Sequence, residues 1–191
     1  MQICLQKRQS HMSTTGSTEQ SRSLLYFKFF LQYLHETGSG TFSGPFSFFM
    51  KIIFDYNRTI YDPEKQELYP GVLVLINGLS NKHELFLVSK NEPGRRDVLD
   101  NLGISSFFKK VIFTDNKSPE LFKEIADNEN NVMVVGDRIR GEISIGNELS
   151  YITVWLKRGK FSLEEPINEK QNPRHTITDI TEVENILKQY G

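Results

Sequence analysis

The chain has 191 residues, with 23 Lys and Arg against 24 Asp and Glu, so its net charge is −1 at pH 7. This length is enough for one domain with a hydrophobic core and a small appendage. The balanced charge gives no support to nucleic-acid binding or membrane-surface binding as the main activity. The single cysteine, Cys4, excludes an internal disulfide framework and a zinc site of several thiolates, and it fits a reducing, cytoplasmic compartment.

Residues 1–49 differ from the rest of the chain. Residues 1–22 are rich in Ser, Thr and Gln and predict a disordered tail. The stretch that begins LLYFKFF predicts one apolar helix over 24–35, which is far shorter than the ~20 apolar residues of a membrane-spanning helix. We interpret residues 1–49 either as a natural, partly disordered N-terminal extension or as a stretch that is not native, with Met50 as the true start. Residues 50–191 form the patterned domain.

From Lys51 onward, short apolar segments alternate with segments of helical periodicity. Strands are predicted in KIIF, ELFLVS, KVIFTD, NVMVVGD and YITVWLK. Helices are predicted in GVLVLINGLS, GRRDVLDNLGI, SPELFKEIAD and RIRGEISIGNEL, and a brief strand and a closing helix in TITDITEVENILKQY. Strands that are apolar nearly throughout and are separated by helices are typical of a parallel sheet covered on both faces. The sequence therefore predicts an α/β fold with a three-layer, Rossmann-like sheet.

Polar residues gather at the carboxyl ends of the predicted strands. Asp55, Ser89, Asp115 and Asp137 each end an apolar run. One such Asp alone is most often a helix cap or a turn residue, but this fold brings all four strand ends to one edge, where open α/β sheets bind ligands. Two carboxylates, a lysine and a hydroxyl at that edge are suited to Mg²⁺ and phosphate, since oxygen ligands hold the ion and the other groups bind phosphate oxygens.

The segments IIFDYNRT, LFLVSK, NKSPELF and VMVVGDRIRGEI resemble, in order and spacing, the four motifs of the haloacid dehalogenase-like (HAD) hydrolases. The resemblance covers residues 50–191 and implies a Mg²⁺-dependent phosphatase that acts through an aspartyl-phosphate. It implies the following roles: Asp55 as nucleophile and metal ligand, the backbone carbonyl of Asn57 as metal ligand, Ser89 as phosphate ligand, Lys117 as the neutralising cation, and Asp137 and Glu142 as metal ligands, directly or through water.

Structural alternatives stand beside these roles. Lys117 could be a solvated lysine at a helix start, with Lys90 as the competing candidate for its role. Glu142 could be an exposed helical acid that pairs with Arg138, four residues earlier. Ser89 could be a strand-end cap. For the arginines beside the motifs, solvated helix surface is favoured over substrate binding: Arg95, Arg96, Arg138 and Arg140.

Asn57 departs from the pattern, because phosphatases of this family usually carry a second Asp there. An amide has no titrating proton, so it neither protonates a leaving group nor activates water, and such help is worth about 10²–10⁴-fold in rate. Three hypotheses stay open. The protein is a slow phosphatase, or another group supplies the proton (Asp62, Asp115 or His83), or the domain is a catalytically weakened module that binds a phosphorylated ligand without turning it over.

The spacing between the motifs leaves no room for a sizeable cap domain. One helix mostly fills the chain between Asp55 and Ser89, and one crossover helix fills residues 117–137. In the family that the chain resembles, an open site suggests a macromolecular substrate, a large one, or capping by another subunit. The expected partner is a phosphorylated small molecule or a macromolecular phosphoester. A response-regulator-like receiver domain is a more distant alternative; it is disfavoured because paired acids are missing before the Asp55 strand and GDRIRGEI is foreign to it.

Overall fold

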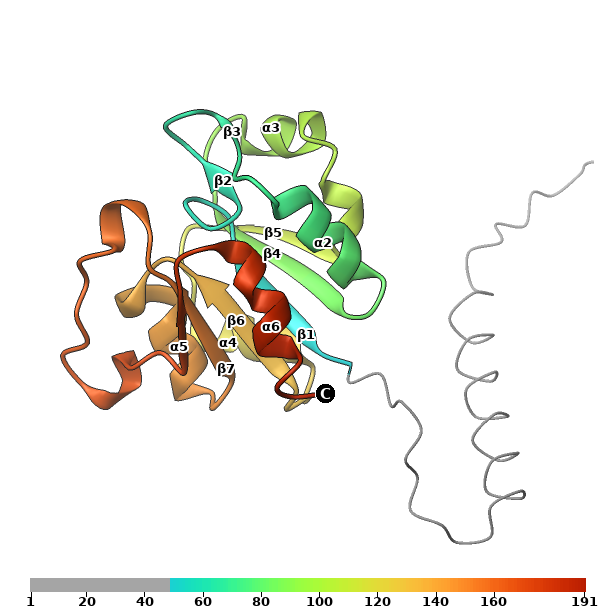
Figure 1. Cartoon of the computed structure of the whole chain (residues 1–191). Coiled ribbons are helices and arrows are strands. Elements are labelled where there is room, and N and C mark those ends of the chain that lie inside the picture. The colour runs from blue at the N-terminus through green and yellow to red at the C-terminus, as the bar shows by residue number, and fades with distance from the viewer. Residues whose placement is uncertain (1–48) are drawn as a thin grey trace, which may run out of the picture. The chain divides into compact units, whose positions relative to one another are not determined.

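The computed structural model describes residues 49–191, the coloured part of the ribbon in Figure 1. The helix predicted over 24–35, and the N-terminal extension apart from its last residue, lie outside the described residues. Among residues 49–191, no helix combines the length and the apolar character needed to cross a membrane.

The core is a parallel sheet of six strands, in the order β5-β4-β1-β6-β7-β8. Its strands are β1 (Lys51–Asp55), β4 (Glu84–Lys90), β5 (Lys110–Thr114), β6 (Val132–Gly136), β7 (Ile152–Leu156) and β8 (His175–Ile177). Every segment predicted as a strand thus contributes to this sheet. β1 is buried along its whole length, since it has a strand on each side and helices on both faces.

Helices cover both faces of the sheet, as predicted (Figure 1). One face packs against α2 (Val72–Ser80), α3 (Arg95–Asn101) and α6 (Val183–Leu187), and the other against α4 (Pro119–Ala126) and α5 (Ser144–Glu148). Because side chains alternate along a strand, Ile52 and Phe54 of β1 enter the first of these cores and Ile53 enters the second. The result is the predicted three-layer α/β architecture.

Local sequence signals set two of the helix starts. α4 begins at Pro119, where the missing N–H has no partner to lose, and the Ser118 hydroxyl accepts a 3.3 Å hydrogen bond from the Leu121 N–H. Before α6, the Asp179 carboxylate accepts from the Thr181 N–H at 2.8 Å, and the Glu182 carboxylate accepts from the Asp179 N–H at 2.9 Å. This capping box fixes the start of the closing helical segment.

Two segments differ from the prediction. After β1 the chain forms an antiparallel hairpin of β2 (Tyr61–Asp62) and β3 (Glu67–Leu68), whose turn is held by N–H bonds to the Asp62 carboxylate. The segment predicted as one helix before β7 is instead a wide helical turn, η2 (Ile139–Ile143), followed by α5, because the backbone departs from helical angles at Gly141. No sizeable cap domain occurs among the described residues.

Candidate active site

Three adjacent strands bring polar side chains to one edge of the sheet. Asp55 ends β1 level with Val88 of β4, so Ser89 lies one residue beyond it. Asp137 directly follows β6, whose pairing with β1 also places it one residue beyond Asp55. Ser89 is buried, and its hydroxyl donates a 3.2 Å hydrogen bond to the Lys90 carbonyl.

Asp55, Asp137 and Glu142 form a carboxylate trio. Each offers one oxygen, and these three oxygens all lie within 4.8 Å of one another. The residues are only 8, 2 and 3% exposed, respectively. Three carboxylates gathered away from water repel one another and lose hydration, so the arrangement is costly without a cation. The trio therefore has the composition and the burial of a site for a hard divalent ion.

The η2 turn brings Glu142 back over the end of β6. Its Oε1 accepts a 3.0 Å hydrogen bond from the Arg138 N–H. Gly136 makes room for this approach, since a Cβ there would overlap the Glu142 side chain. The alternative of an exposed acid paired with the Arg138 side chain is wrong. Glu142 is buried, and the Arg138 Nε lies 3.7 Å from Glu164 instead.

Lys117 contacts two members of the trio. Its Nζ donates to Asp55 Oδ1 and lies 3.3 Å from Glu142 Oε2. The loop from β5 to α4 positions it one residue before the Ser118 cap. Burial acts to lower the pKa of Lys117, but the two carboxylates outweigh this and raise it above its ordinary value. Lys117 is thus held as a cation and is not a solvated lysine, whereas Lys90 is exposed at the end of β4.

Thr59 is a site residue that the sequence reasoning did not single out. Its side chain is fully buried, and its hydroxyl donates a 3.2 Å hydrogen bond to Asp55 Oδ2. With Lys117 on Oδ1, both oxygens of Asp55 have a partner, which fixes the orientation of the carboxylate. The only signal in the sequence is a hydroxyl four residues after the strand-end acid, inside a polar cluster.

Lys117 does not fully offset the charges of the trio, because the pKa values of Asp55 and Asp137 stay raised beside it. Burial, followed by the charges of Asp55 and Glu142, raises the pKa of Asp137 to about 8. Burial also raises the pKa of Asp55, against the attraction of Lys117. Asp137 Oδ2 is buried and has no hydrogen-bond partner, while the Asp137 carbonyl accepts a 2.9 Å bond from Trp155 Nε1. A buried carboxylate with an unsatisfied oxygen, grouped with two further carboxylates, fits Mg²⁺, which prefers oxygen ligands.

Asn57 is bound by an arginine from another element. Arg95 of α3 donates from Nη1 to Asn57 Oδ1 at 2.7 Å. The guanidinium also lies 4.6 Å from the centre of the Tyr56 ring and forms an ion pair with Glu92. Arg95 is buried, so its interpretation as solvated helix surface is wrong. Nothing in the spacing of the sequence indicated this contact, because α3 reaches Asn57 only through the tertiary fold.

The other groups proposed as proton sources lie in different settings. His83 Nδ1 accepts a bond from the Met50 N–H, directly before the start of β1, so it lies at the opposite edge of the sheet. The Asp62 carboxylate is engaged by two N–H groups of the hairpin turn. Asp115 is exposed after the end of β5. The geometry excludes His83 from the chemistry of the site.

The protein is similar in structure to known proteins, although its sequence matches no family model and no curated protein. Among solved structures, a HAD-superfamily hydrolase of subfamily IA from Geobacter sulfurreducens is 11% identical, with a TM-score of 0.57, over 72% of this chain and 99% of that one. YfnB from Bacillus subtilis, assigned to the HAD hydrolases and solved with bound magnesium, is 21% identical, with a TM-score of 0.54, over 64% of this chain and 57% of that one.

A HAD phosphatase from Thermococcus onnurineus is also 21% identical, with a TM-score of 0.53, over 63% of this chain and 58% of that one. The chain therefore spans nearly the whole of one of these proteins and little more than half of the other two. The likeness agrees with the six-stranded parallel sheet and the helices that cover it. This chain has the fold of the haloacid dehalogenase-like hydrolases.

Proposed function

We propose that the protein is a Mg²⁺-dependent phosphohydrolase that cleaves phosphomonoesters through an aspartyl-phosphate on Asp55. The observation that carries this proposal is the position of Asp55, which lies between the Lys117 ammonium and two further buried carboxylates at the carboxyl edge of the sheet. The hydrolases and the phosphatase that share the fold support the same class of reaction.

The residues that would hold Mg²⁺ are Asp55, Asp137 and Glu142, with the backbone carbonyl of Asn57 as a further ligand. Bound Mg²⁺ would supply positive charge that ionises the trio and draws electron density from the phosphoryl oxygens. The buried, unpartnered Oδ2 of Asp137 supports this assignment, because no protein donor competes for that oxygen.

Asp55 carries both chemical steps, and solvent exchanges the protons that Asn57 cannot give or take. Asp55 attacks phosphorus; a bond from its carboxylate oxygen to phosphorus forms as the bond from phosphorus to the leaving oxygen breaks. Lys117 offsets the negative charge that gathers between nucleophile and phosphoryl group, and the Ser89 hydroxyl donates a hydrogen bond to a phosphoryl oxygen. Water then attacks phosphorus, the aspartyl–phosphate bond breaks, and inorganic phosphate leaves with Asp55 restored.

The reaction should be slow for ordinary alkyl phosphates. Asn57 supplies no proton to the leaving oxygen and takes none from the attacking water, and this loss costs about 10²–10⁴-fold. Substrates whose leaving group needs no proton, such as acyl phosphates, avoid the part of this rate loss that comes from the unprotonated leaving oxygen. Without a cap domain among the described residues, the substrate is a phosphorylated small molecule or a macromolecular phosphoester.

A second candidate function follows from the Arg95–Asn57 contact. A side-chain amide bound by a buried guanidinium is a stable recognition group, which suits a module that binds a phosphorylated ligand and does not turn it over. Such a module would keep its affinity for Mg²⁺ and phosphate and release no phosphate from any substrate.

The test is Mg²⁺-dependent phosphate release by the full chain from a panel of phosphoesters and acyl phosphates. We expect wild type to hydrolyse an acyl phosphate and Asp55→Asn to lose that activity. Asp127→Asn is the matched control and should keep it, because Asp127 is an exposed acid after α4, near the start of β1. Activity that survives Asp55→Asn would contradict the aspartyl-phosphate route. Phosphate binding without turnover in wild type, with turnover gained in Asn57→Asp, would favour the binding module.

A further inference from the structure

Three cations surround one aromatic ring at the rim of the site. The side chains of Arg58, Arg138 and Lys160, here called the basic cluster, lie 5.7, 4.4 and 5.6 Å from the centre of the Phe161 ring. Phe161 belongs to the loop that follows β7. The loop and the site are packed together, because a Cβ on Gly159 would lie 3.6 Å from Arg58 Cδ.

Both arginines of the basic cluster lie close in sequence to members of the trio. Arg138 directly follows Asp137, and Arg58 comes three residues after Asp55. Arg58 has a φ of 61°, and its N–H donates to the Tyr61 carbonyl at 2.8 Å. Burial and the neighbouring carboxylates raise the pKa of Asp137, and the charge of Arg58 acts to lower it, so this guanidinium lies within electrostatic reach of the trio.

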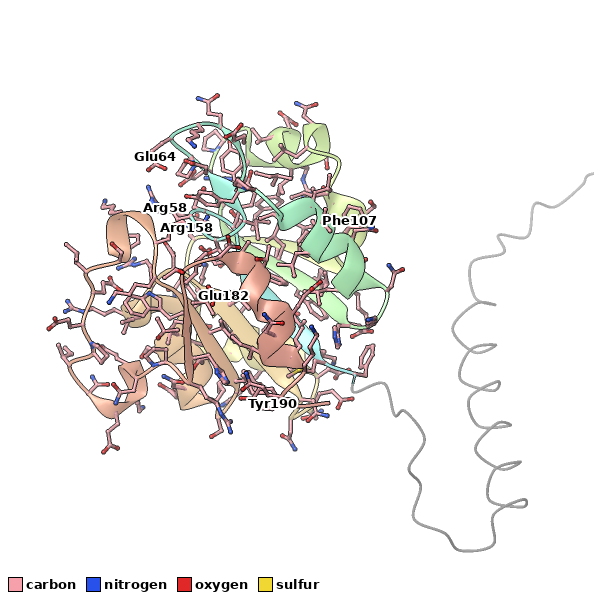
Figure 2. The ribbon with its side chains drawn as sticks, viewed as in Figure 1. Arg58, Glu64, Phe107, Arg158, Glu182 and Tyr190 are labelled. Carbon is pink, nitrogen blue, oxygen red and sulfur yellow. The ribbon has the colours of Figure 1, made fainter. Side chains whose placement is uncertain are left out.

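Arg58 has an unused donor at this position. Its Nε is buried without a hydrogen-bond partner, and its Nη2 reaches only the exposed Glu64, at 3.5 Å. Figure 2 shows Arg58 and Glu64 at the β2–β3 hairpin. Such a surface ion pair contributes little. Among the described residues, the other buried side-chain atoms without a partner are Asp137 Oδ2 and the Tyr56 hydroxyl. The site thus leaves one carboxylate oxygen that fits a cation and one guanidinium without a strong partner among the described residues.

Two acids offset part of the positive charge of the basic cluster: Glu64 pairs with Arg58 at 3.5 Å and Glu164 with Arg138 at 3.7 Å. The cluster still has an excess of positive charge, because Lys160 pairs with no acid among the described residues. Glu164 is also shared, since its other oxygen accepts from the N–H groups of Ile139 and Arg140 at 2.8 and 3.4 Å. Like charges gathered on one ring repel one another, so an anion among them is stabilised. Guanidinium groups suit carboxylate and phosphate in particular, because their N–H groups match the spacing of those oxygens.

We propose that the basic cluster is a subsite for a second anionic group of the substrate. The phosphoryl group would lie at the trio, and a carboxylate or second phosphate of the same molecule would lie on Arg58 and Arg138. This inference rests on the proposed function and narrows its substrate class to phosphomonoesters that also carry an acidic group.

The test uses phosphonates, since their carbon–phosphorus bond is not hydrolysed by this route. Phosphonoacetate, phosphonopropionate and phosphonobutyrate are compared with ethyl-, propyl- and butylphosphonate, which lack the carboxylate. Affinities for the full chain with Mg²⁺ are measured by calorimetry for wild type, Arg58→Gln and Arg138→Gln. Lys170→Gln is the matched control, because it removes a cation that pairs with Glu148 on α5 instead.

We expect the carboxylate to increase affinity for wild type at least about tenfold at one chain length or more. Arg58→Gln and Arg138→Gln should each remove most of that increase while changing alkylphosphonate affinity less than about twofold, and Lys170→Gln should change neither. The subsite is overturned if the arginine substitutions weaken the carboxylated and the plain phosphonates equally. It is also overturned if the carboxylate gives wild type no increase in affinity, or if that increase persists in both Arg58→Gln and Arg138→Gln. If wild type binds Mg²⁺ but neither series, the proposed function itself fails.

Discussion

Arg95 donates a 2.7 Å hydrogen bond from Nη1 to Asn57 Oδ1, across 38 residues of sequence. Because Arg95 occupies the side-chain carbonyl oxygen, the remaining hydrogen-bonding groups of the Asn57 side chain are the two N–H donors on Nδ2. Position 57 is thus held as a permanent donor. Arg95 is itself fixed by the Tyr56 ring and by Glu92, so the contact does not depend on a mobile surface side chain.

The same contact predicts what Asn57→Asp does. A carboxylate beside Arg95 would have a lowered pKa, so it would activate water as a base but give no proton to a leaving oxygen. We expect Asn57→Asp to increase hydrolysis of acyl phosphates and to leave alkyl phosphates poor substrates. Combining it with Arg95→Met should raise the pKa of the new Asp and improve alkyl phosphates about tenfold or more.

The measurement is the pH dependence of kcat/KM for both variants, with Arg95→Met alone as control. The double variant should show an additional loss of rate toward high pH, where the new Asp loses its proton. If the two variants have the same pH profile, Arg95 does not control the ionisation of position 57.

Mg²⁺ binding should release a proton near neutral pH. The pKa of Asp137 is about 8 in the metal-free fold, so this carboxyl is largely protonated at pH 7, and a bound cation would ionise it. Titration calorimetry of Mg²⁺ binding in buffers of different ionisation enthalpy measures the number of protons released. Asp137→Asn should reduce both the proton release and the Mg²⁺ affinity, and release that persists unchanged in this variant would contradict the assignment.

The same shift gives a stability prediction whose sign is fixed. The folded-state pKa of Asp137, about 8, lies above its value of 3.8 for an unfolded chain, so the folded state binds the extra proton. The metal-free protein should therefore lose stability, relative to Asp137→Asn, as the pH rises from about 4 through 8, and Mg²⁺ should restore it. Denaturant unfolding of both proteins across that pH range measures the difference.

Most of the sheet could be predicted from the sequence, because its strands are apolar on both faces and each ends at a polar residue. Asp55, Ser89 and Asp137 follow from that pattern, since parallel strands place their carboxyl ends at one edge. The contacts of Arg95 and Thr59 could not be predicted in the same way. Arg95 reaches Asn57 only because α3 packs beside the loop after β1, and Thr59 reaches Asp55 only because the backbone folds back after Tyr56.

The interruption of the predicted helix at Gly141 also depends on tertiary contacts. The segment RIRGEISIGNEL has helical periodicity, and a regular helix was predicted from it. The structure instead opens the first turn, so that Glu142 turns back toward β6 and accepts from the Arg138 N–H. Glu142 joins Asp55 and Asp137 through the tertiary fold, so the local helix propensity of the segment does not predict this break.

Gly136→Ala should damage the trio without touching a carboxylate. The added Cβ overlaps the Glu142 side chain, so Glu142 has to move away from Asp55 and Asp137. We expect Mg²⁺ affinity to fall about tenfold or more and stability to fall by about 1–3 kcal/mol. Gly78→Ala, in the middle of α2, is the matched control; its nearest neighbour is 3.7 Å away. That change should stabilise by about 0.5–1 kcal/mol and leave Mg²⁺ affinity unchanged.

Thr59→Val should separate the orientation of the nucleophile from the stability of the fold. Valine keeps the shape of the buried side chain and removes the hydroxyl that donates to Asp55 Oδ2. The carboxylate would then lose the hydroxyl partner of its Oδ2, and we expect kcat to fall about tenfold with KM nearly unchanged. Thr153→Val is the control, because Thr153 is equally buried and its hydroxyl bonds Asn147 and the Arg174 N–H. It should lower the unfolding temperature and leave kcat intact. Equal effects of the two substitutions on kcat would show that the hydroxyl of Thr59 serves packing and does not orient Asp55.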